Sequence, residues 1–264
     1  MKFVPAAAIA ALLIGAAPVH AAPQSVRGIS DLPEVDRLAE GDALHRGLRP
    51  LEALDVFAEI LEVDPHHFGA LWRSARSSVS LGMLAPSESA RQQRYREAEG
   101  YARRALDVDA DRAEGHLWLS IALGRRALNE GIRTRIGLAR EARGEARFVL
   151  EADPQNAGAH HVLGQWHAEV MRAAGISRFV ARRLLGGREL DEASWEAAEE
   201  HLLEAVRLAP ETLIHHLELG RLYLDTKRPD EARSELREVL ERPALEPTDP
   251  LHKQKAQDLL RALS

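Results

Sequence analysis

The amino-acid sequence predicts an all-α protein, a right-handed superhelical solenoid of about five helix pairs closed by a C-terminal capping helix. Apolar residues recur at intervals typical of one helical face, and the same set of intervals returns five times along the chain. No stretch shows the alternation typical of a strand. Aromatic residues make up 5% of the chain, which is low for a β-sandwich and ordinary for Ala- and Leu-rich helices.

The repeat is clearest in the segment ASWEAAEEHLLEAVRLAP, where Ala198, Leu202, Ala205 and Pro210 stand at offsets 0, 4, 7 and 12. Offsets of four and seven place apolar side chains on one face of a helix, and proline ends that helix. The same offsets recur as Ala53, Phe57, Ile60, Pro65; Ala98, Ala102, Ala105, Ala110; Ala142, Ala146, Val149, Pro154; and Ala232, Leu236, Val239, Ala244.

Another helix precedes each of these, with a small residue followed three positions later by a further characteristic residue. The clearest case is Gly220 with Tyr223. This pattern resembles the tetratricopeptide family, whose standard repeat has 34 residues. The predicted repeats are 34–67, 68–112, 113–156, 157–212 and 213–246, with a cap at 249–263. In 68–112, 113–156 and 157–212, expanded helices or insertions are expected, with the extra residues between the two helices of the pair.

The first residues resemble a secretory signal peptide. Lys2 supplies a positive charge, the stretch 3–17 is apolar, and Val19-His20-Ala21 suits cleavage after Ala21. The predicted organisation is a signal peptide at 1–21, a short linker at 22–33 and the solenoid at 34–264. We therefore expect an exported chain, periplasmic or secreted, without a membrane span after cleavage. An uncleaved N-terminal anchor is the alternative.

Composition and missing motifs argue against several functional classes. The formal charge of −6 gives no basic surface for nucleic acid. The chain has no cysteine, and therefore no disulfide, thiolate nucleophile or cysteine-ligated metal. Neither a glycine-rich phosphate loop nor a GxSxG nucleophile elbow is present. We predict no enzymatic activity and no cofactor.

Five segments suggest a closer relative. In order they are LWRSARS at 71–77, AEGYARRALDVDA at 98–110, GIRTRIGLAREA at 131–142, HVLGQWHAE at 161–169 and ISRFVARRLLGG at 176–187. Together they resemble the regulator of microtubule dynamics family across about residues 66–262. The resemblance implies a tetratricopeptide-like helical domain used for association. Eukaryotic members are linked to microtubules and organelle membrane contacts, a context that an export signal departs from, so only the fold and the binding character are carried over.

The family pattern places certain residues of each first helix in a concave groove. The fifth and ninth positions give the candidate groove residues Leu38, Trp72, Arg76, Leu117, Ile121, His161, Gln165, Leu217 and Arg221. Leu, Ile and Trp at these positions favour an apolar peptide face or an acyl chain over an acidic tail. Lengthened helices that fill the groove are the alternative. Trp118, Trp166 and Trp195 are predicted to pack mainly between helices.

A basic segment lies in the longest repeat. Its candidate contacts for an anionic partner or a lipid headgroup are Arg172, Arg178, Phe179, Arg182, Arg183 and Arg188. The alternative is a packed helix whose arginines pair with the acidic residues that follow. A second cluster, predicted to form a positive ridge with the first, comprises Arg125, Arg126, Arg133, Arg135 and Arg140.

The 12 histidines include three, His116, His160 and His216, at the fourth position of successive first helices. Helices in neighbouring repeats pack about 10 Å apart, which is too far for these rings to share one ion. We therefore predict no metal site, and histidines that serve the core or the surface.

These observations predict a non-enzymatic protein–protein interaction scaffold of the cell envelope that binds an unidentified protein or peptide in its concave groove. The alternative is a lipid-binding module, in which a phospholipid places its acyl chains in the groove and its headgroup on the arginine-rich segment.

Overall fold

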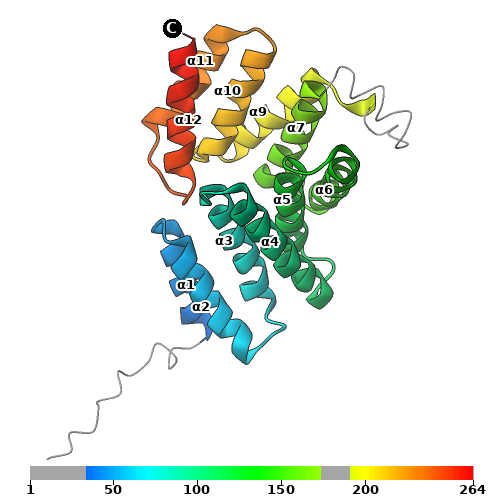
Figure 1. Cartoon of the computed structure of the whole chain (residues 1–264), viewed down its shortest axis with the longest axis vertical. Coiled ribbons are helices and arrows are strands. Elements are labelled where there is room, and N and C mark those ends of the chain that lie inside the picture. Colours follow the sequence, from blue (N-terminus) through cyan, green and yellow to red (C-terminus); the bar gives the residue numbers. More distant parts are fainter. Residues whose placement is uncertain (1–33, 174–190, 264) are drawn as a thin grey trace, which may run out of the picture. The chain divides into compact units, whose positions relative to one another are not determined.

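The structure is a computed structural model and describes residues 34–173 and 191–263 of the 264-residue chain. These residues form helices and no strand, which confirms the predicted all-α class (Figure 1). No helix among them is both long enough and apolar enough to cross a membrane. The helices are α1 (Glu34–Arg46), α2 (Pro50–Val63), α3 (Phe68–Leu84), α4 (Glu88–Val108), α5 (Ala113–Ala127), α6 (Ile132–Ala152), α7 (Ala157–Arg172), α9 (Trp195–Leu208), α10 (Leu213–Asp225), α11 (Pro229–Glu241) and α12 (Asp249–Ala262).

Consecutive helices pack against each other in antiparallel pairs, and successive pairs lie side by side, as a tetratricopeptide-like solenoid requires (Figure 1). The first helices of neighbouring pairs also contact one another: α1 touches α3, α3 touches α5, α5 touches α7, α7 touches α10 and α10 touches α12. The second helices touch mainly the first helices that flank them. The first helices therefore form an inner layer and the second helices an outer layer.

The recurring apolar residues of the second helices form the core. All fifteen residues at offsets 0, 4 and 7 of the five repeats are buried, with exposed fractions between 0% and 8%. Each set faces the first helix of its own pair and the pair that follows, for example Ala53 and Phe57 against Leu71. Prolines 65, 154 and 210 lie in the turns just after α2, α6 and α9, as their inability to continue a helix predicts.

Helix beginnings are fixed by local hydrogen bonds. The side chains of Ser87, Asn156 and Ser194 accept hydrogen bonds from the backbone N–H three residues later, at 3.2, 3.0 and 3.0 Å. Such caps satisfy backbone donors that a helix leaves unpaired in its first turn. Pro50 and Pro229 occupy the first positions of α2 and α11, where a missing N–H costs nothing.

The extra residues of two long repeats lengthen their helices, which is the first of the two forms that the sequence predicted. The hairpin of 68–112 keeps only residues 85–87 between α3 and α4, and that of 113–156 keeps 128–131 between α5 and α6. Instead α4 and α6 reach 21 residues each, against 14 for α2. In α4 the added turns bury Tyr95, whereas Ile132 in the first turn of α6 stays 47% exposed.

Three histidines at equivalent positions tie each first helix to the turn before it. The Nε2 atoms of His116, His160 and His216 donate to the carbonyl oxygens of Ala110, Pro154 and Pro210, at 2.7, 3.1 and 2.9 Å. The other ring nitrogen contacts the second helix: His116 meets Glu145, His160 meets His201 and His216 meets Glu235. The rings thus hold together the turn and both helices of a pair.

Replacing His216 by Ala should lower the free energy of unfolding by about 1–3 kcal/mol, because the Pro210 carbonyl oxygen and the Glu235 carboxylate lose their partner. Urea unfolding of the purified chain measures this. His66→Ala is the control, since His66 is an exposed histidine. Equal effects of the two substitutions would contradict the structural role of His216.

Candidate functional site

The inner helices surround a cavity of about 700 Å³. Its walls come from α3, α5, α6, α7 and α10, and residues 246–252, which lead into α12, complete it. Cavities of about 300–1,000 Å³ are typical of sites that hold small ligands or apolar side chains of a partner. The cavity is therefore the candidate functional site.

Most of the cavity wall is apolar, with aromatic residues on three sides. Trp72, Trp118 and Trp166 come from α3, α5 and α7. Aliphatic side chains fill the wall between them: Val79, Met83, Leu117, Ile121, Leu128, Ile132, Ile136, Val162, Val170 and Ile214. Such a surface releases water when an apolar group enters, which favours binding by about 25 cal/mol per Å² buried.

Six of the nine predicted groove residues line this cavity: Trp72, Arg76, Leu117, Ile121, His161 and Gln165. The other three lie elsewhere. Leu38 packs on the core of the first pairs, and Leu217 is 1% exposed within the core between α10 and α12. Arg221 forms an ion pair with Glu218.

The lengthened α6 lines the cavity without filling it, since its N-terminal half supplies Ile132 and Ile136 to the wall. Trp118 and Trp166 pack between helices as predicted, and both also belong to the wall. Trp166 is only 7% exposed, so it contributes to both the core and the cavity. The first helices place these rings on the inner side of the solenoid, because the repeats curve around the cavity.

The Trp72 side of the wall is held by charged neighbours. The guanidinium of Arg73 lies 4.1 Å from the centre of the Trp72 ring. Asp42 of α1 accepts hydrogen bonds from Arg73 Nε at 2.9 Å and Arg76 Nη2 at 2.6 Å. Burial alone would raise the pKa of Asp42, but the hydrogen bonds from the two arginines outweigh it and the pKa is lowered. The aromatic wall is thus fixed in place before any ligand enters.

Two buried histidines stack at the opposite side. The His161 and His215 rings have centroids 5.0 Å apart, and His215 Nδ1 donates to the Ala205 carbonyl oxygen at 3.1 Å. Burial lowers the pKa of His215 to about 4. Burial, followed by the charges of His215 and Arg125, lowers the pKa of His161 well below its usual 6.5. Both rings are uncharged at neutral pH.

The segment before α12 contacts both ends of the solenoid. Asp249 accepts hydrogen bonds from the backbone N–H groups of Leu245 and Glu246, each at 2.8 Å, and faces His252 Nδ1 at 3.3 Å. Glu246 lies 3.3 Å from Nε2 of His45 in α1. These contacts set Glu246, Asp249 and His252 into the cavity wall.

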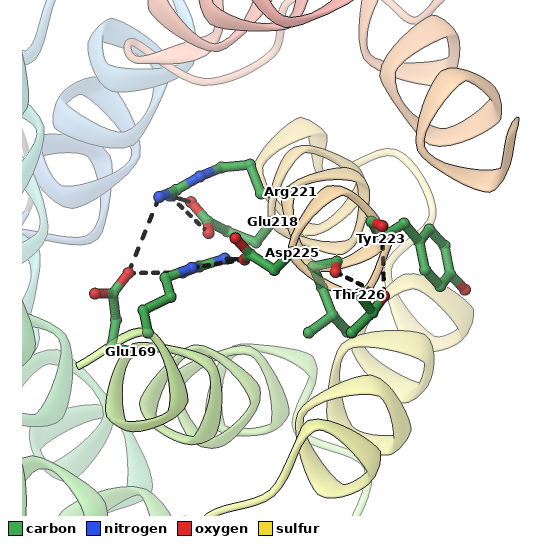
Figure 2. A network of polar contacts seen from close by, with 8 residues as sticks. Glu169, Glu218, Arg221, Tyr223, Asp225 and Thr226 are labelled. Atoms are coloured by element: carbon green, nitrogen blue, oxygen red, sulfur yellow. Dashed lines mark hydrogen bonds and ion pairs between the residues drawn. The ribbon is translucent and has the colours of Figure 1, made fainter. Parts of the chain in front are cut away.

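A network of charged side chains borders the cavity where α7 meets α10 (Figure 2). Arg172 donates to Glu169 at 2.7 Å and to Asp225 at 2.7 Å. Arg221 donates to both oxygens of Glu218, at 2.8 and 2.9 Å. Glu169 also lies 4.0 Å from Nη2 of Arg221, so it contacts both arginines and opposite charges alternate along the network.

The predicted basic segment is only partly described. Arg172 is paired with carboxylates, but these are Glu169 and Asp225 and not the acidic residues that directly follow the segment. Arg178, Phe179, Arg182, Arg183 and Arg188 lie outside the described residues.

The residues of the second predicted cluster have different surroundings, and its ridge with the first cluster stays a prediction because most of that cluster lies outside the described residues. Arg125 and Arg135 line the cavity, whereas Arg126 pairs with Glu99 of α4. Neighbouring residues on a helix point in directions about 100° apart, so Arg125 and Arg126 face different surroundings.

Histidine and carboxylate groups do not gather into a metal site within residues 34–173 and 191–263. Carbonyl oxygens and second-helix side chains already occupy the ring nitrogens of His116, His160 and His216.

The sequence positions used to predict the groove missed Arg125, Leu128 and the residues around Asp249. Arg125 and Leu128 lie one to two turns beyond the ninth position of a first helix, so continuing the register along the long α5 would have found them. The residues before α12 carry no repeat pattern, and no local spacing indicates their place in the cavity.

The helical layers and the inner cavity define a tetratricopeptide-like scaffold, a fold used for protein–protein interaction. A solved structure, that of a thermophilic TPR protein from Thermus thermophilus, is similar to it with a TM-score of 0.62. The two chains are 22% identical, and the match covers 87% of this chain and 100% of that one.

The chain belongs to the family of Regulator of microtubule dynamics protein 1-3, whose family model matches residues 32–264. This confirms the resemblance found in the sequence. Regulator of microtubule dynamics protein 1 of Bos taurus is 28% identical over 196 residues, covering 74% of this chain and 61% of that protein. Regulator of microtubule dynamics protein 3 of Rattus norvegicus is 25% identical over 154 residues, covering 58% and 31%. The chain thus spans less than two thirds of these relatives.

Acidification from about pH 7 to about pH 5 should destabilise the fold, because buried neutral histidines resist protonation. The pKa of His215 is lower in the folded chain than the usual 6.5, so the unfolded chain binds more protons between pH 4 and 6.5. The stability that His215 contributes is therefore present above pH 6.5 and lost as the pH falls toward 4, with about 2 kcal/mol gone at pH 5.

Urea unfolding at several pH values measures this loss. His215→Asn can still donate to the Ala205 carbonyl oxygen but does not titrate, so its stability should fall about 2 kcal/mol less over the same range. Identical pH dependence of the stability in the wild type and in His215→Asn would contradict the assignment of this loss to His215.

Proposed function

We propose that the chain is a non-catalytic interaction scaffold of the cell envelope that holds an apolar segment of a partner protein in its central cavity. The tetratricopeptide-like fold supports a protein partner. The observation that carries the proposal is the apolar cavity of about 700 Å³ bounded by the inner helices. We infer nothing about this chain from the microtubule connection in the relatives' names, nor from the parts of those relatives that this chain does not span.

Two properties of the wall favour binding of an apolar segment. Tryptophans provide large contact areas and dominate many protein interfaces, and three of them face this cavity. Trp72 is also held in place by Arg73 and Arg76, which sit 4.1 and 5.4 Å from its ring and pair with Asp42. A wall that is ordered before binding loses little entropy when the partner arrives.

Gly124 allows the cavity to be filled by substitution. It lines the cavity on α5, and a Cβ built on it meets no atom within 4 Å. Gly144 on α6 has equally open space but lies outside the cavity lining. Gly124→Phe and Gly144→Phe are therefore a matched pair: both replace a helical glycine, and only the first occupies the cavity.

A photoreactive amino acid in place of Leu117 should crosslink one defined partner in intact cells, whereas one in place of Leu203 should not. Leu117 lines the cavity, and Leu203 is 45% exposed on α9, away from it. Gly124→Phe should abolish the crosslink from position 117, and Gly144→Phe should preserve it. An unchanged crosslink yield in Gly124→Phe, or crosslinking from position 203 alone, would show that the partner does not bind in the cavity.

Export is the second part of the proposal. If residues 1–21 are a signal peptide, intact-mass measurement of the protein from the envelope fraction should give a chain that begins at Ala22. A cytoplasmic protein that retains Met1 and Lys2 would contradict export, and an envelope protein with the same N-terminus would indicate an uncleaved anchor.

A second candidate function is lipid binding, and the enclosure of the cavity by apolar side chains favours it. An alkyl chain has no backbone amides that need hydrogen-bond partners, so an apolar wall accepts it at low cost. Solvent extraction and mass spectrometry of the purified chain test this. Lipid should accompany the wild type and Gly144→Phe but not Gly124→Phe, and lipid-free wild-type protein would end this candidate.

A further inference from the structure

The charges in the cavity wall are not balanced. Glu169 pairs with Arg172, Glu246 with His45, and Asp249 accepts two backbone N–H groups. On the cationic side, Arg76 pairs with Asp42. Arg125 differs: its guanidinium forms no hydrogen bond or ion pair with any residue that the structure describes, although the residue is partly buried. Arg135 of the same wall donates only to the carbonyl oxygens of Ala127 and Leu128. Two arginines of the wall therefore have no carboxylate partner in the described part of the chain, and of these Arg125 also has no hydrogen-bond acceptor.

Buried polar atoms near the cavity also lack partners. Trp166 Nε1, His161 Nδ1 and His252 Nε2 are buried and form no hydrogen bond within the described part of the chain. Their residues are 7%, 7% and 2% exposed, and all three line the cavity. An unpaired buried polar group costs about 1–3 kcal/mol, so each favours a ligand that supplies the missing partner.

The Arg125 guanidinium contributes to the lowered pKa of two of these neighbours, His161 and His252. The pKa of His252 is lowered, by burial first, and the positive charge of Arg125 contributes in the same direction despite the nearby Asp249. Arg125 likewise contributes to the lowered pKa of His161, together with His215 and His252. Arg125, His161 and His252 therefore lie close enough to interact, and they come from α5, α7 and α12.

We propose that the cavity binds a single-chain aliphatic carboxylic acid, with its carboxylate on the Arg125 guanidinium and its alkyl chain along the tryptophan-lined wall. This rests on the second candidate function and specifies its ligand. A guanidinium presents two parallel N–H donors that match the two oxygens of a carboxylate. The Trp166 indole N–H is a further donor within the same cavity. The Arg125 guanidinium has no acceptor among the described residues, and a ligand carboxylate supplies both an acceptor and a negative charge.

The alkyl chain follows from the rest of the wall. A peptide in this position would bury several amides for each apolar side chain, whereas the unpartnered polar atoms are few. An unbranched carboxylic acid places its one polar group at Arg125, and its alkyl chain needs no hydrogen-bond partner. The chemistry of the wall therefore also suits a long-chain carboxylic acid.

Isothermal titration of the full mature chain with decanoate, decanol and acetate tests the proposal. Decanoate should bind more tightly than decanol because of the carboxylate, and more tightly than acetate because of the chain. Arg125→Gln should weaken decanoate binding roughly ten- to a hundredfold, the loss expected for a charged hydrogen bond, and leave decanol binding unchanged. Arg125→Lys should recover part of the loss. Arg237→Gln, at an exposed arginine of α11, is the control and should change nothing.

Each result has a distinct meaning. Decanoate affinity that survives Arg125→Gln, or decanol affinity that falls equally, would overturn the carboxylate assignment while the cavity remains a binding site. Failure of all three compounds to bind the wild type would remove the lipid candidate together with this inference. Tighter binding of dioctanoyl phosphatidylglycerol than of decanoate would replace the carboxylic acid by a phospholipid.

Discussion

The fold depends on how closely the two helices of a pair approach each other. Gly41 in α1 faces Phe57 in α2, and a Cβ built on Gly41 would lie 2.3 Å from the Phe57 ring. Gly164 in α7 faces Leu202 in α9 in the same way, with 2.7 Å to the leucine side chain. A glycine thus makes room for a large partner, and the second helix fits against the first in one register. Rigid pairs of this kind can stack only side by side.

That stacking creates the cavity and determines its chemistry. Because first helices contact first helices, their remaining faces point toward a common interior, and the long α5 and α6 extend the wall. Fixed aromatic rings, neutral buried histidines and Arg125, which has no hydrogen-bond or ion-pair partner among the described residues, then meet in a space of about 700 Å³. Their arrangement is suited to holding a mostly apolar ligand.

The sequence was most informative where structure repeats. The offsets of four and seven identified fifteen buried residues, and the order of short motifs identified the family, because both depend on local spacing along a helix. It was least informative about the cavity. Arg125 and His252 meet there only because the curvature of the solenoid brings α5, α7 and α12 together, and spacing within one repeat does not encode that curvature. For the long α4 and α6 the sequence predicted expanded helices or insertions and did not decide between the two.

The central claim is that the interior of the solenoid is the binding site. Titration with N-phenyl-1-naphthylamine, a neutral apolar fluorophore, tests it without depending on the identity of any partner or on charge. We expect saturable binding with one probe per chain for the wild type and Gly144→Phe, and at least roughly tenfold weaker binding for Gly124→Phe, which fills the cavity. Equal affinity of all three proteins would contradict the account.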